Sequence, residues 1–241
     1  MASDPHASSG SRDTPALAIG AARPTPMWMD GLARRLQPLS VCWPPSSADH
    51  RSAAVLVLVS EGSDPDLVLT LRSADLEHHG GQVSFPGGGR EPGDHAPVDT
   101  ALREAWEEVG LRSSTVRPLG QLHTRQIPVS QNHVVPVVGV WPGDDPLMVH
   151  DTDEVDTILR WTLADLARPD QRVMARHPRG GVGPAWQIQD IFLWGFTAGL
   201  VDAVLRLGGW EQPWDATRVV DVPERFLSGR PDRPGRVDHS S

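Results

Sequence analysis

A run of three glycines followed by a helix with three acidic residues on one face is the feature that most limits how this chain can fold. The glycines are Gly87 to Gly89, and the helix is expected over Pro97–Val109, with proline at an early position and Gly110 as its C-terminal stop. Adjacent glycines let the backbone approach a ligand or a metal ion closely, because no Cβ atom intervenes. The chain therefore predicts a loop and a helix as its functional centre.

Short apolar runs on both sides of this unit predict strands, so the expected fold class is mixed α/β. Residues 53–59 and 67–71 flank turn-forming residues and are expected to form a β-hairpin. Further strands are expected at 82–85, 116–123, 134–141, 157–161 and 185–188, and helices at 28–39, 163–167 and 190–207. Pro136 indicates an edge strand or a bulge. Gly195 and Gly199 are expected to permit close packing of the last helix on the sheet.

The length and composition predict one globular domain with loop-rich or disordered margins. The chain has 241 residues, of which 39% are hydrophobic and 22% charged. Residues 1–26 and 223–241 are rich in small and polar residues and are expected to be disordered tails, which leaves 27–222 as the domain. The N-terminus lacks a signal-peptide pattern, and the longest apolar run is too short to span a membrane, so a cytoplasmic location is expected.

Several classes of function are excluded by what the chain lacks. It has no lysine and no tyrosine, which excludes Schiff-base catalysis and a phenolic base. Its single cysteine, Cys42, cannot form an internal disulfide or a cysteine-rich zinc site. The formal net charge of -9 opposes binding to nucleic acid or to an anionic membrane surface, so the expected partner is a small molecule. The oligomeric state stays open.

The acidic face of the helix has two interpretations. Glu104 lies beside Glu107 and Glu108 at helical spacings of three and four residues. Each like-charge pair destabilises an isolated helix by about 0.2–0.5 kcal/mol, so a solvated acidic face with Arg103 paired to Glu107 is one possibility. The other is a divalent metal site, since Mg²⁺ prefers oxygen ligands and usually keeps several waters.

The sequence Arg-Glu-Ala-Trp-Glu-Glu-Val-Gly-Leu at 103–111, with the glycines before it, resembles the motif of the Nudix hydrolases. That motif has a glycine, an upstream acid and then Arg-Glu-x-x-Glu-Glu-x-Gly at fixed spacing. Here His95 stands where the acid is expected and Asp94 lies one residue earlier, so one extra loop residue reconciles the two. The resemblance implies an α/β/α sandwich around a mixed β-sheet, a catalytic loop–helix–loop, and a pyrophosphohydrolase that uses Mg²⁺ or Mn²⁺.

A second stretch is similar to the signature of the coenzyme A pyrophosphatases. It comprises Leu-Thr-Leu-Arg-Ser at 69–73 and Gly-Gln-Val-Ser-Phe-Pro-Gly-Gly at 81–88, and the resemblance covers roughly 53–207. It implies hydrolysis of coenzyme A or its thioesters to 3′,5′-ADP and 4′-phosphopantetheine. Glu77 stands where that signature usually has arginine. A pyrophosphatase for ADP-ribose, dinucleotides or another nucleoside diphosphate derivative is therefore one alternative, and a non-catalytic ligand-sensing domain is another.

The resemblance also implies roles for individual residues. The expected metal ligands are Glu104, Glu108, Glu107 and the carbonyl of Gly88, and the expected catalytic residues are Glu104, Arg103, Glu107 and Glu154. The residues expected to bind substrate are Arg72, Gln82, Phe85 and Arg125. Arg103 is expected to orient the carboxylates, because a guanidinium can bridge two of them. Glu154, in the acidic loop 150–156, is a candidate general base, with Glu104 or no separate base as the alternatives.

Overall fold

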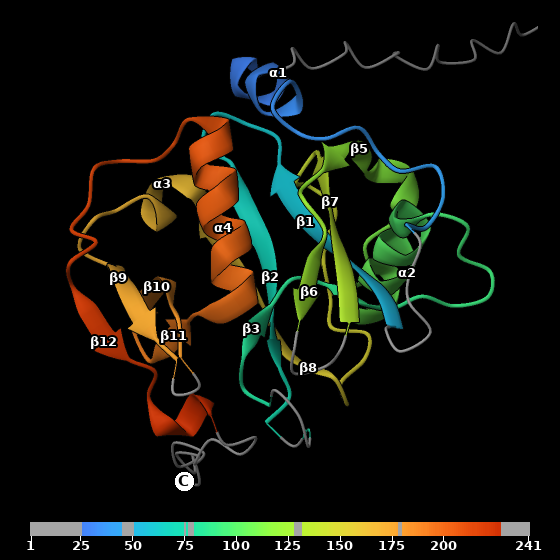
Figure 1. Cartoon of the computed structure of the whole chain (residues 1–241). Coiled ribbons are helices and arrows are strands. Elements are labelled where there is room, and N and C mark those ends of the chain that lie inside the picture. The colour runs from blue at the N-terminus through green and yellow to red at the C-terminus, as the bar shows by residue number, and fades with distance from the viewer. Residues whose placement is uncertain are drawn as a thin grey trace, which may run out of the picture.

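A mixed sheet lies at the centre of the molecule, between helices on its two faces (Figure 1). The computed structural model describes residues 26–44, 51–74, 76, 80–127, 132–177 and 180–227. The strands of this main sheet are β1 (Arg51–Ser60), β2 (Asp66–Arg72), β3 (Val83–Ser84), β4 (Gly87–Gly89), β5 (Arg117–Gln121), β6 (Arg125–Ile127), β7 (Asn132–Trp141) and β8 (Val155–Thr162). A path through β3, β2, β1, β7 and β5 is hydrogen-bonded throughout, while β4 pairs with β1, β6 with β7 and β8 with β2.

Strands β1 and β7 run parallel at the centre of the sheet, and β1 pairs antiparallel with β2, which confirms the expected hairpin. Almost every Val and Leu of β1 is buried, because helices cover both faces of the sheet. On one face, Leu56 and Leu58 pack in a cluster with Ala105 of helix α2 (Pro97–Val109). On the other, Val57 and Val59 belong to a cluster with the helix α4 (Gly195–Gly208). The α/β/α arrangement around a mixed sheet is thereby confirmed.

A second, smaller sheet stands beside α4, and only one of its strands was expected from the sequence. Its order is β11 (Ile191–Leu193), β10 (Val182–Ile188), β9 (Arg172–Arg176) and β12 (Val219–Asp221). The helix expected from residue 190 is therefore wrong over its first turn. A Cβ atom at Gly199 would meet nothing within 4 Å, so this glycine does not permit a close approach, and Gly195 instead begins α4 with a φ of +69°.

Pro136 lies inside the main sheet and not on an edge strand, but the other expected alternative, a bulge, fits the pairing. Between the pairs Gln121–Val137 and Arg125–Val134, three residues lie opposite two residues of β7. Pro136 pairs with Val55 of β1 on one side, and its carbonyl accepts a hydrogen bond from Leu122 N at 2.9 Å on the other. Leu122 lies in the gap between β5 and β6. The N–H and C=O groups of one strand residue point to the same side of the strand. The N–H that Pro136 lacks would therefore face the gap between β5 and β6, so its absence costs the sheet few hydrogen bonds.

The remaining helices are short, and the C-terminal boundary differs from the expected one. Helix α1 covers only Met27–Ala33, and α3 covers Leu163–Leu166. A 3₁₀ turn, η2 (Glu224–Phe226), follows β12, and Phe226 is only 6% exposed, so ordered structure continues past residue 222. Residues 1–25 and 228–241, where tails were expected, lie outside the described part of the chain. Within the described residues, no helix has the length and apolar character needed to cross a membrane.

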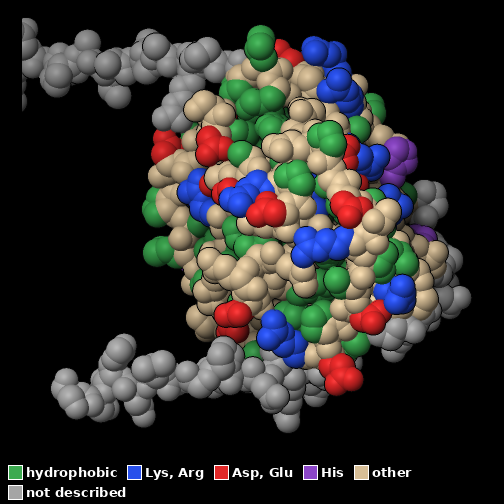
Figure 2. Space-filling model, turned by 90° about the vertical axis from the view of Figure 1, so that its left-hand side faces the viewer, with side chains coloured by type: hydrophobic (Ala, Val, Ile, Leu, Met, Phe, Trp, Pro, Cys, Tyr) green, Lys and Arg blue, Asp and Glu red, His purple; other side chains and the backbone are tan. Residues whose placement is uncertain are grey.

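A buried arginine joins the small sheet to α4. Arg172 of β9 has a fully buried side chain that lies between the rings of Trp186 and Trp214, and it donates a hydrogen bond to Asp202 of α4 at 2.5 Å. Other arginine and acidic side chains lie next to one another on the surface of the molecule, as Figure 2 shows for one face, whereas the Arg172 side chain is buried. Because Arg172 has no access to water, Asp202 is the main compensation for its charge.

Removing this compensation is expected to destabilise the fold. Asp202→Asn leaves a buried guanidinium with incomplete pairing, so the free energy of unfolding in urea should fall by about 3 kcal/mol. Asp170→Asn, which removes the exposed partner of Arg168, is the matched control and should leave the midpoint unchanged. Equal midpoints for wild type and Asp202→Asn would contradict the assigned role of the pair.

Candidate active site

Helix α2 is positioned by its two ends and by its buried face. At the start, Asp99 Oδ2 accepts hydrogen bonds from the backbone N–H groups of His95 and Ala96, at 2.9 and 2.8 Å. At the end, Gly110 adopts a left-handed conformation with a φ of +68° and its N–H bonds to the carbonyl of Trp106. Because the opposite side of the helix packs in the core, the side that carries the glutamates faces β4 and the loop after it.

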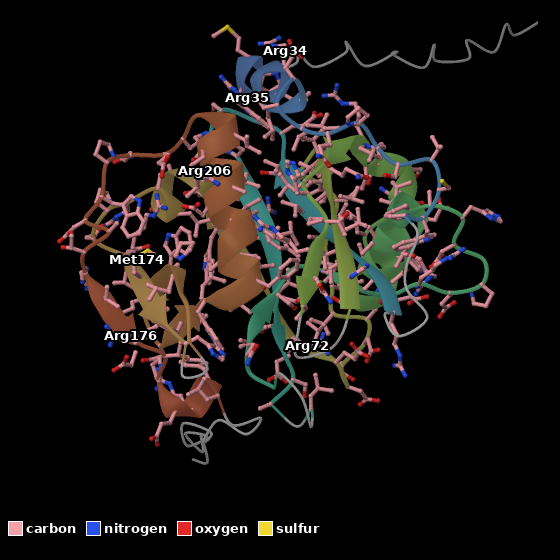
Figure 3. All side chains as sticks on the ribbon, in the orientation of Figure 1. Arg34, Arg35, Arg72, Met174, Arg176 and Arg206 are labelled. Atoms are coloured by element: carbon pink, nitrogen blue, oxygen red, sulfur yellow. The ribbon has the colours of Figure 1, made fainter. Side chains whose placement is uncertain are left out.

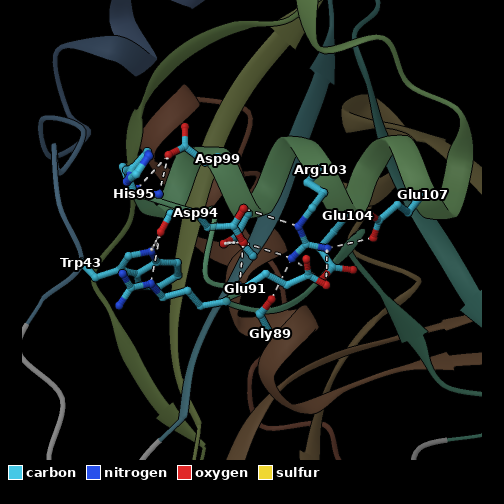
Figure 4. A network of polar contacts seen from close by, with 12 residues as sticks. Trp43, Gly89, Glu91, Asp94, His95, Asp99, Arg103, Glu104 and Glu107 are labelled. Carbon is cyan, nitrogen blue, oxygen red and sulfur yellow. Dashed lines mark hydrogen bonds and ion pairs between the residues drawn. The ribbon is translucent and has the colours of Figure 1, made fainter.

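Arg103 is the centre of a polar network on this side of the helix (Figure 4). Its guanidinium donates to Glu107 Oε2 at 2.8 Å, to Glu104 Oε1 at 3.0 Å and to the carbonyl oxygen of Gly89 at 2.8 Å. Burial alone would lower the pKa of Arg103, but the hydrogen bond with Asp94 and the charge of Glu104 outweigh it, so the pKa rises. One permanently charged side chain thus holds two glutamates and the glycine strand together.

Asp94 occupies the acidic position beside Arg103, and His95 does not. Asp94 is 5% exposed, and its Oδ2 accepts from Thr100 Oγ1 at 2.6 Å, from Glu91 N at 2.9 Å and from Arg103 Nη2 at 3.1 Å. Burial would raise the pKa of Asp94, but these hydrogen bonds outweigh it and the pKa is lowered. The exposed His95 makes only its backbone contact. Sequence spacing left this choice open, and the burial of Asp94 resolves it.

Glu108 is the most buried carboxylate of the cluster. It is 3% exposed; its Oε1 accepts a long hydrogen bond from Gly87 N at 3.5 Å, and its buried Oε2 has no hydrogen-bond partner among the described residues. Burial raises the pKa of Glu108 to about 8, and the charges of Glu104 and Glu154 add to the rise, against the opposing effect of Arg72. A buried carboxylate oxygen without a donor is costly unless a cation compensates it.

Glu104 lies directly over the backbone of Gly88. A Cβ atom at position 88 would come within 2.4 Å of Glu104 Oε1, so any other residue here would displace this carboxylate from its present position. Burial is also the main cause that raises the pKa of Glu104; Arg103 opposes it, and Glu107 and Glu154 add to it. The glycine run thus lets a carboxylate lie close to the backbone, and the metal-binding role expected for this segment stays a prediction.

These donors fit a hard divalent cation. Among the described residues, Glu108 supplies a carboxylate oxygen without a hydrogen-bond donor, and Glu104 supplies a second carboxylate, which lies against the backbone of Gly88. Glu107 is more exposed and bonded to Arg103. In the parts of the chain that the structure describes, no three acidic, histidine or cysteine side chains already form a compact ligand group. Glu104 and Glu107 accept hydrogen bonds from Arg103 and do not converge on a common point with Glu108.

Glu154 and Arg72 come to this cluster from another part of the chain. Arg72 lies at the end of β2 (Figure 3), and its Nη2 is 3.4 Å from Glu154 Oε2 in the turn before β8. That turn is fixed by Asp151 Oδ1, which accepts from the backbone N–H groups of residues 153 and 154 at 3.0 and 3.1 Å. The charges of both residues act on the pKa of Glu108, so the structure places them beside the carboxylates.

The other predicted substrate residues lie elsewhere. Gln82 Nε2 donates to the carbonyl oxygen of Phe226 at 3.0 Å. Phe85 is 3% exposed in the hydrophobic core, so its expected contact with substrate is wrong in this structure, because apolar side chains of both sheets enclose its ring. Arg125 is exposed on β6, and no hydrogen bond or ion pair joins it to the carboxylates in the described structure. Glu77 lies outside the described residues.

A cavity of about 330 Å³ lies away from these carboxylates. Its lining comes from β8, α3 and the region of the β10–β11 hairpin, and comprises Leu159, Trp161, Asp165, Leu166, Gln171, Ile188, Gln189 and Ile191. None of these residues carries a predicted catalytic role. The charged groups of the cluster, rather than this cavity, therefore define the candidate active site.

Comparison with known proteins shows the family of the chain. The model of the NUDIX domain family matches residues 49–180. A protein from Cronobacter sakazakii named uncharacterized Nudix hydrolase NudL is 37% identical over 188 residues, which cover 76% of this chain and 97% of that protein. The protein of the same name from Escherichia coli strain SMS-3-5 is 37% identical over 164 residues, which cover 66% and 84%. The chain belongs to the Nudix hydrolase family.

A solved structure gives a weaker similarity. The Nudix hydrolase RenU of M. smegmatis superposes with a TM-score of 0.48 and 19% identity, over 69% of this chain and 90% of that one. Membership of the family makes the chain a pyrophosphohydrolase, an enzyme that cleaves a pyrophosphate bond in small nucleoside diphosphate derivatives. Nudix hydrolases generally use divalent metal ions, which is consistent with the oxygen donors described above.

The contact between Gly88 and Glu104 can be tested by adding one methyl group. Gly88→Ala should weaken Mn²⁺ binding by about 10–100-fold, because the new Cβ displaces the Glu104 carboxylate. Isothermal titration of the protein with MnCl₂ measures the effect. Gly93→Ala is the matched control, because a Cβ there meets nothing within 4 Å. An unchanged Mn²⁺ affinity in Gly88→Ala would count against Gly88 and Glu104 as neighbouring ligands.

The raised pKa of Glu108 predicts a pH dependence of stability in metal-free protein. Its pKa is 4.5 ordinarily, and this value applies to the unfolded chain; in the folded chain it is about 8. Between these values the folded chain keeps a proton that the unfolded chain has released. The free energy of unfolding should therefore fall as pH rises from about 4.5 to about 8, by at most about 1.4 kcal/mol per pH unit.

Urea unfolding in EDTA at pH 5.5, 6.5 and 7.5 measures this dependence. Glu108→Gln cannot ionise and should flatten the fall, whereas the exposed Glu107→Gln should retain it. A fall of equal size in Glu108→Gln would show that another group is responsible.

Proposed function

We propose that this enzyme hydrolyses the pyrophosphate bond of coenzyme A or its thioesters, with Mg²⁺ or Mn²⁺, to give 3′,5′-ADP and 4′-phosphopantetheine or its acyl derivative. The observation that carries the chemistry is the buried, unpartnered Oε2 of Glu108 beside Glu104 and the Gly88 backbone. The sequence signature at 69–73 and 81–88 supports the choice of coenzyme A. The NudL relatives are named as uncharacterized, so their names add no substrate.

The carboxylates would hold the metal through Glu104, Glu108 and the Gly88 carbonyl, with Glu107 as a further ligand. When bound, a divalent cation neutralises charge on the bridge oxygens and lowers the pKa of bound water. Arg103 keeps the Glu104 carboxylate oriented, and Asp94 in turn holds Arg103. Because Asp94 holds Arg103 and Arg103 holds Glu104, the Glu104 carboxylate is already oriented before substrate binds.

Arg72 is the cation best placed to bind a substrate phosphate. Its side chain is 23% exposed and its only ion-pair partner among the described residues is Glu154, which is half exposed at 48%. A phosphate carries more negative charge than one carboxylate and can replace Glu154 as the partner of the guanidinium. Released from Arg72, Glu154 would be free to accept a proton from the attacking water as general base. Glu104 is the alternative base.

The main alternative is the same reaction on ADP-ribose, a dinucleotide or another nucleoside diphosphate derivative. Glu77 favours it, because an acidic residue in place of an arginine reduces attraction for the additional 3′-phosphate of coenzyme A. A non-catalytic sensing role has less support, because the carboxylate set is complete and the chain belongs to a family of hydrolases.

A substrate panel tests the proposal. Incubation with coenzyme A, acetyl-coenzyme A, ADP-ribose and diadenosine polyphosphates, followed by mass analysis, should show the fastest turnover for coenzyme A or its thioester. Glu104→Gln and Glu108→Gln should each lower kcat/KM by about 100-fold or more, because each removes a charged metal ligand. Asp64→Asn, an exposed turn residue, is the control. Turnover of ADP-ribose equal to or above that of coenzyme A would reject the substrate assignment.

A further inference from the structure

The C-terminal turn η2 is seated on the small sheet. The ring of Phe226 packs against Phe192, with ring centroids 5.9 Å apart, and both belong to the buried cluster of that sheet. Arg225 Nη2 donates to the carbonyl oxygen of Asp190 at 3.1 Å, and its guanidinium lies over the Phe226 ring. The end of the described chain is therefore fixed in place by aromatic packing and by a hydrogen bond to the β10–β11 turn.

Gln82 connects this turn to the strand end that carries Arg72. Its side-chain Nε2 donates to the carbonyl oxygen of Phe226 at 3.0 Å, a contact between residues 144 positions apart. The backbone carbonyl oxygen of Gln82 accepts a hydrogen bond from Arg72 N at 2.9 Å, and the backbone carbonyl oxygen of Arg72 accepts one from Gly81 N at 3.0 Å. One residue thus contacts the C-terminal turn with its side chain and the phosphate-binding candidate with its backbone.

The backbone at Arg72 depends on this support, because its other ladder is irregular. The register between β2 and β8 shifts between Leu71 and Arg72. The ladder to β8 therefore does not continue evenly up to Arg72, and the bonds to Gly81 and Gln82 supply the regular pairing at this position. Since the guanidinium projects from that backbone toward Glu154, a displacement of Gln82 moves the charge that faces the substrate.

We propose that Gln82 is a positioning residue, which couples the C-terminal turn Glu224–Phe226 to Arg72 and so sets the affinity for substrate phosphates without binding the metal. The inference rests on the proposed function only in taking Arg72 as the phosphate-binding cation. It gives the segment after residue 222 a part in substrate binding, although that segment lies beyond the region matched by the family model.

A double-mutant cycle tests the coupling. Gln82→Met keeps the approximate shape of the side chain and removes the hydrogen-bond donor. Phe226→Ala removes the ring whose packing against Phe192 holds the turn in place. Titration with α,β-methylene-ADP in the presence of Mg²⁺ should show a dissociation constant about fivefold higher in each, the equivalent of one neutral hydrogen bond. The double variant should have a dissociation constant for α,β-methylene-ADP no higher than that of the weaker-binding single variant, because both changes break the same contact. Phe226→Leu replaces Phe226→Ala if the latter does not fold.

Two further readouts separate positioning from a general structural effect. Affinity for MnCl₂ alone should be unchanged in Gln82→Met, while on a cleaved substrate KM should rise and kcat should stay constant. Gln187→Met is the control, because it makes the same chemical change at an exposed position of β10, where the side chain contacts Arg218. It should leave the dissociation constant unchanged.

The inference is overturned by an unchanged dissociation constant in Gln82→Met, by effects that multiply in the double variant, by a parallel loss of Mn²⁺ affinity, or by a wild-type protein that does not bind the probe. Failure of the proposed function looks different. An enzyme that cleaves ADP-ribose rather than coenzyme A still binds a diphosphate, and the cycle then remains a valid test.

Discussion

The site depends on one constraint, which is the burial of like-charged carboxylates at the place where a glycine strand meets a helix. Glu104 and Glu108 lie within the packed interface between α2 and β4, where burial raises the pKa of both. Arg103, held by the buried Asp94, relieves part of the repulsion on one side of the cluster. On the side of Glu108 Oε2, no donor from the described residues forms a hydrogen bond, and this asymmetry supports the proposal that the cluster binds a cation.

The two halves of the site have separate supports. The half with the proposed metal ligands is carried by α2, whose apolar face packs against the main sheet, so that its geometry is fixed by the central core. The half that we propose to face the substrate phosphates, Arg72 with Glu154, is carried by a strand end and a turn. Its backbone support reaches the small sheet through Gln82 and Phe226.

Local elements were predictable where several signals in the sequence agreed. Helix α2 has the expected bounds, because an early proline, an apolar stripe and Gly110 all specify the same segment. The signals failed where a short apolar run fits more than one structure. Residues 191–193 continue the helical pattern of the following residues but pair with β10 as a strand. Pro136 forbids only one hydrogen bond, and whether that bond is needed depends on what neighbours the strand.

The sequence by itself determined that a glycine run precedes the acidic helix, and with it the family and the class of reaction, because these depend on spacing within one short segment. It predicted a loop for the glycines, which form strand β4 because they pair with β1. Only the tertiary structure decided which acid accompanies Arg103, that Phe85 is core rather than site, and that Arg72 and Glu154 meet. These outcomes depend on burial and on pairing between segments that are distant in the chain. No local pattern encodes the position of a strand end relative to a turn some 80 residues later.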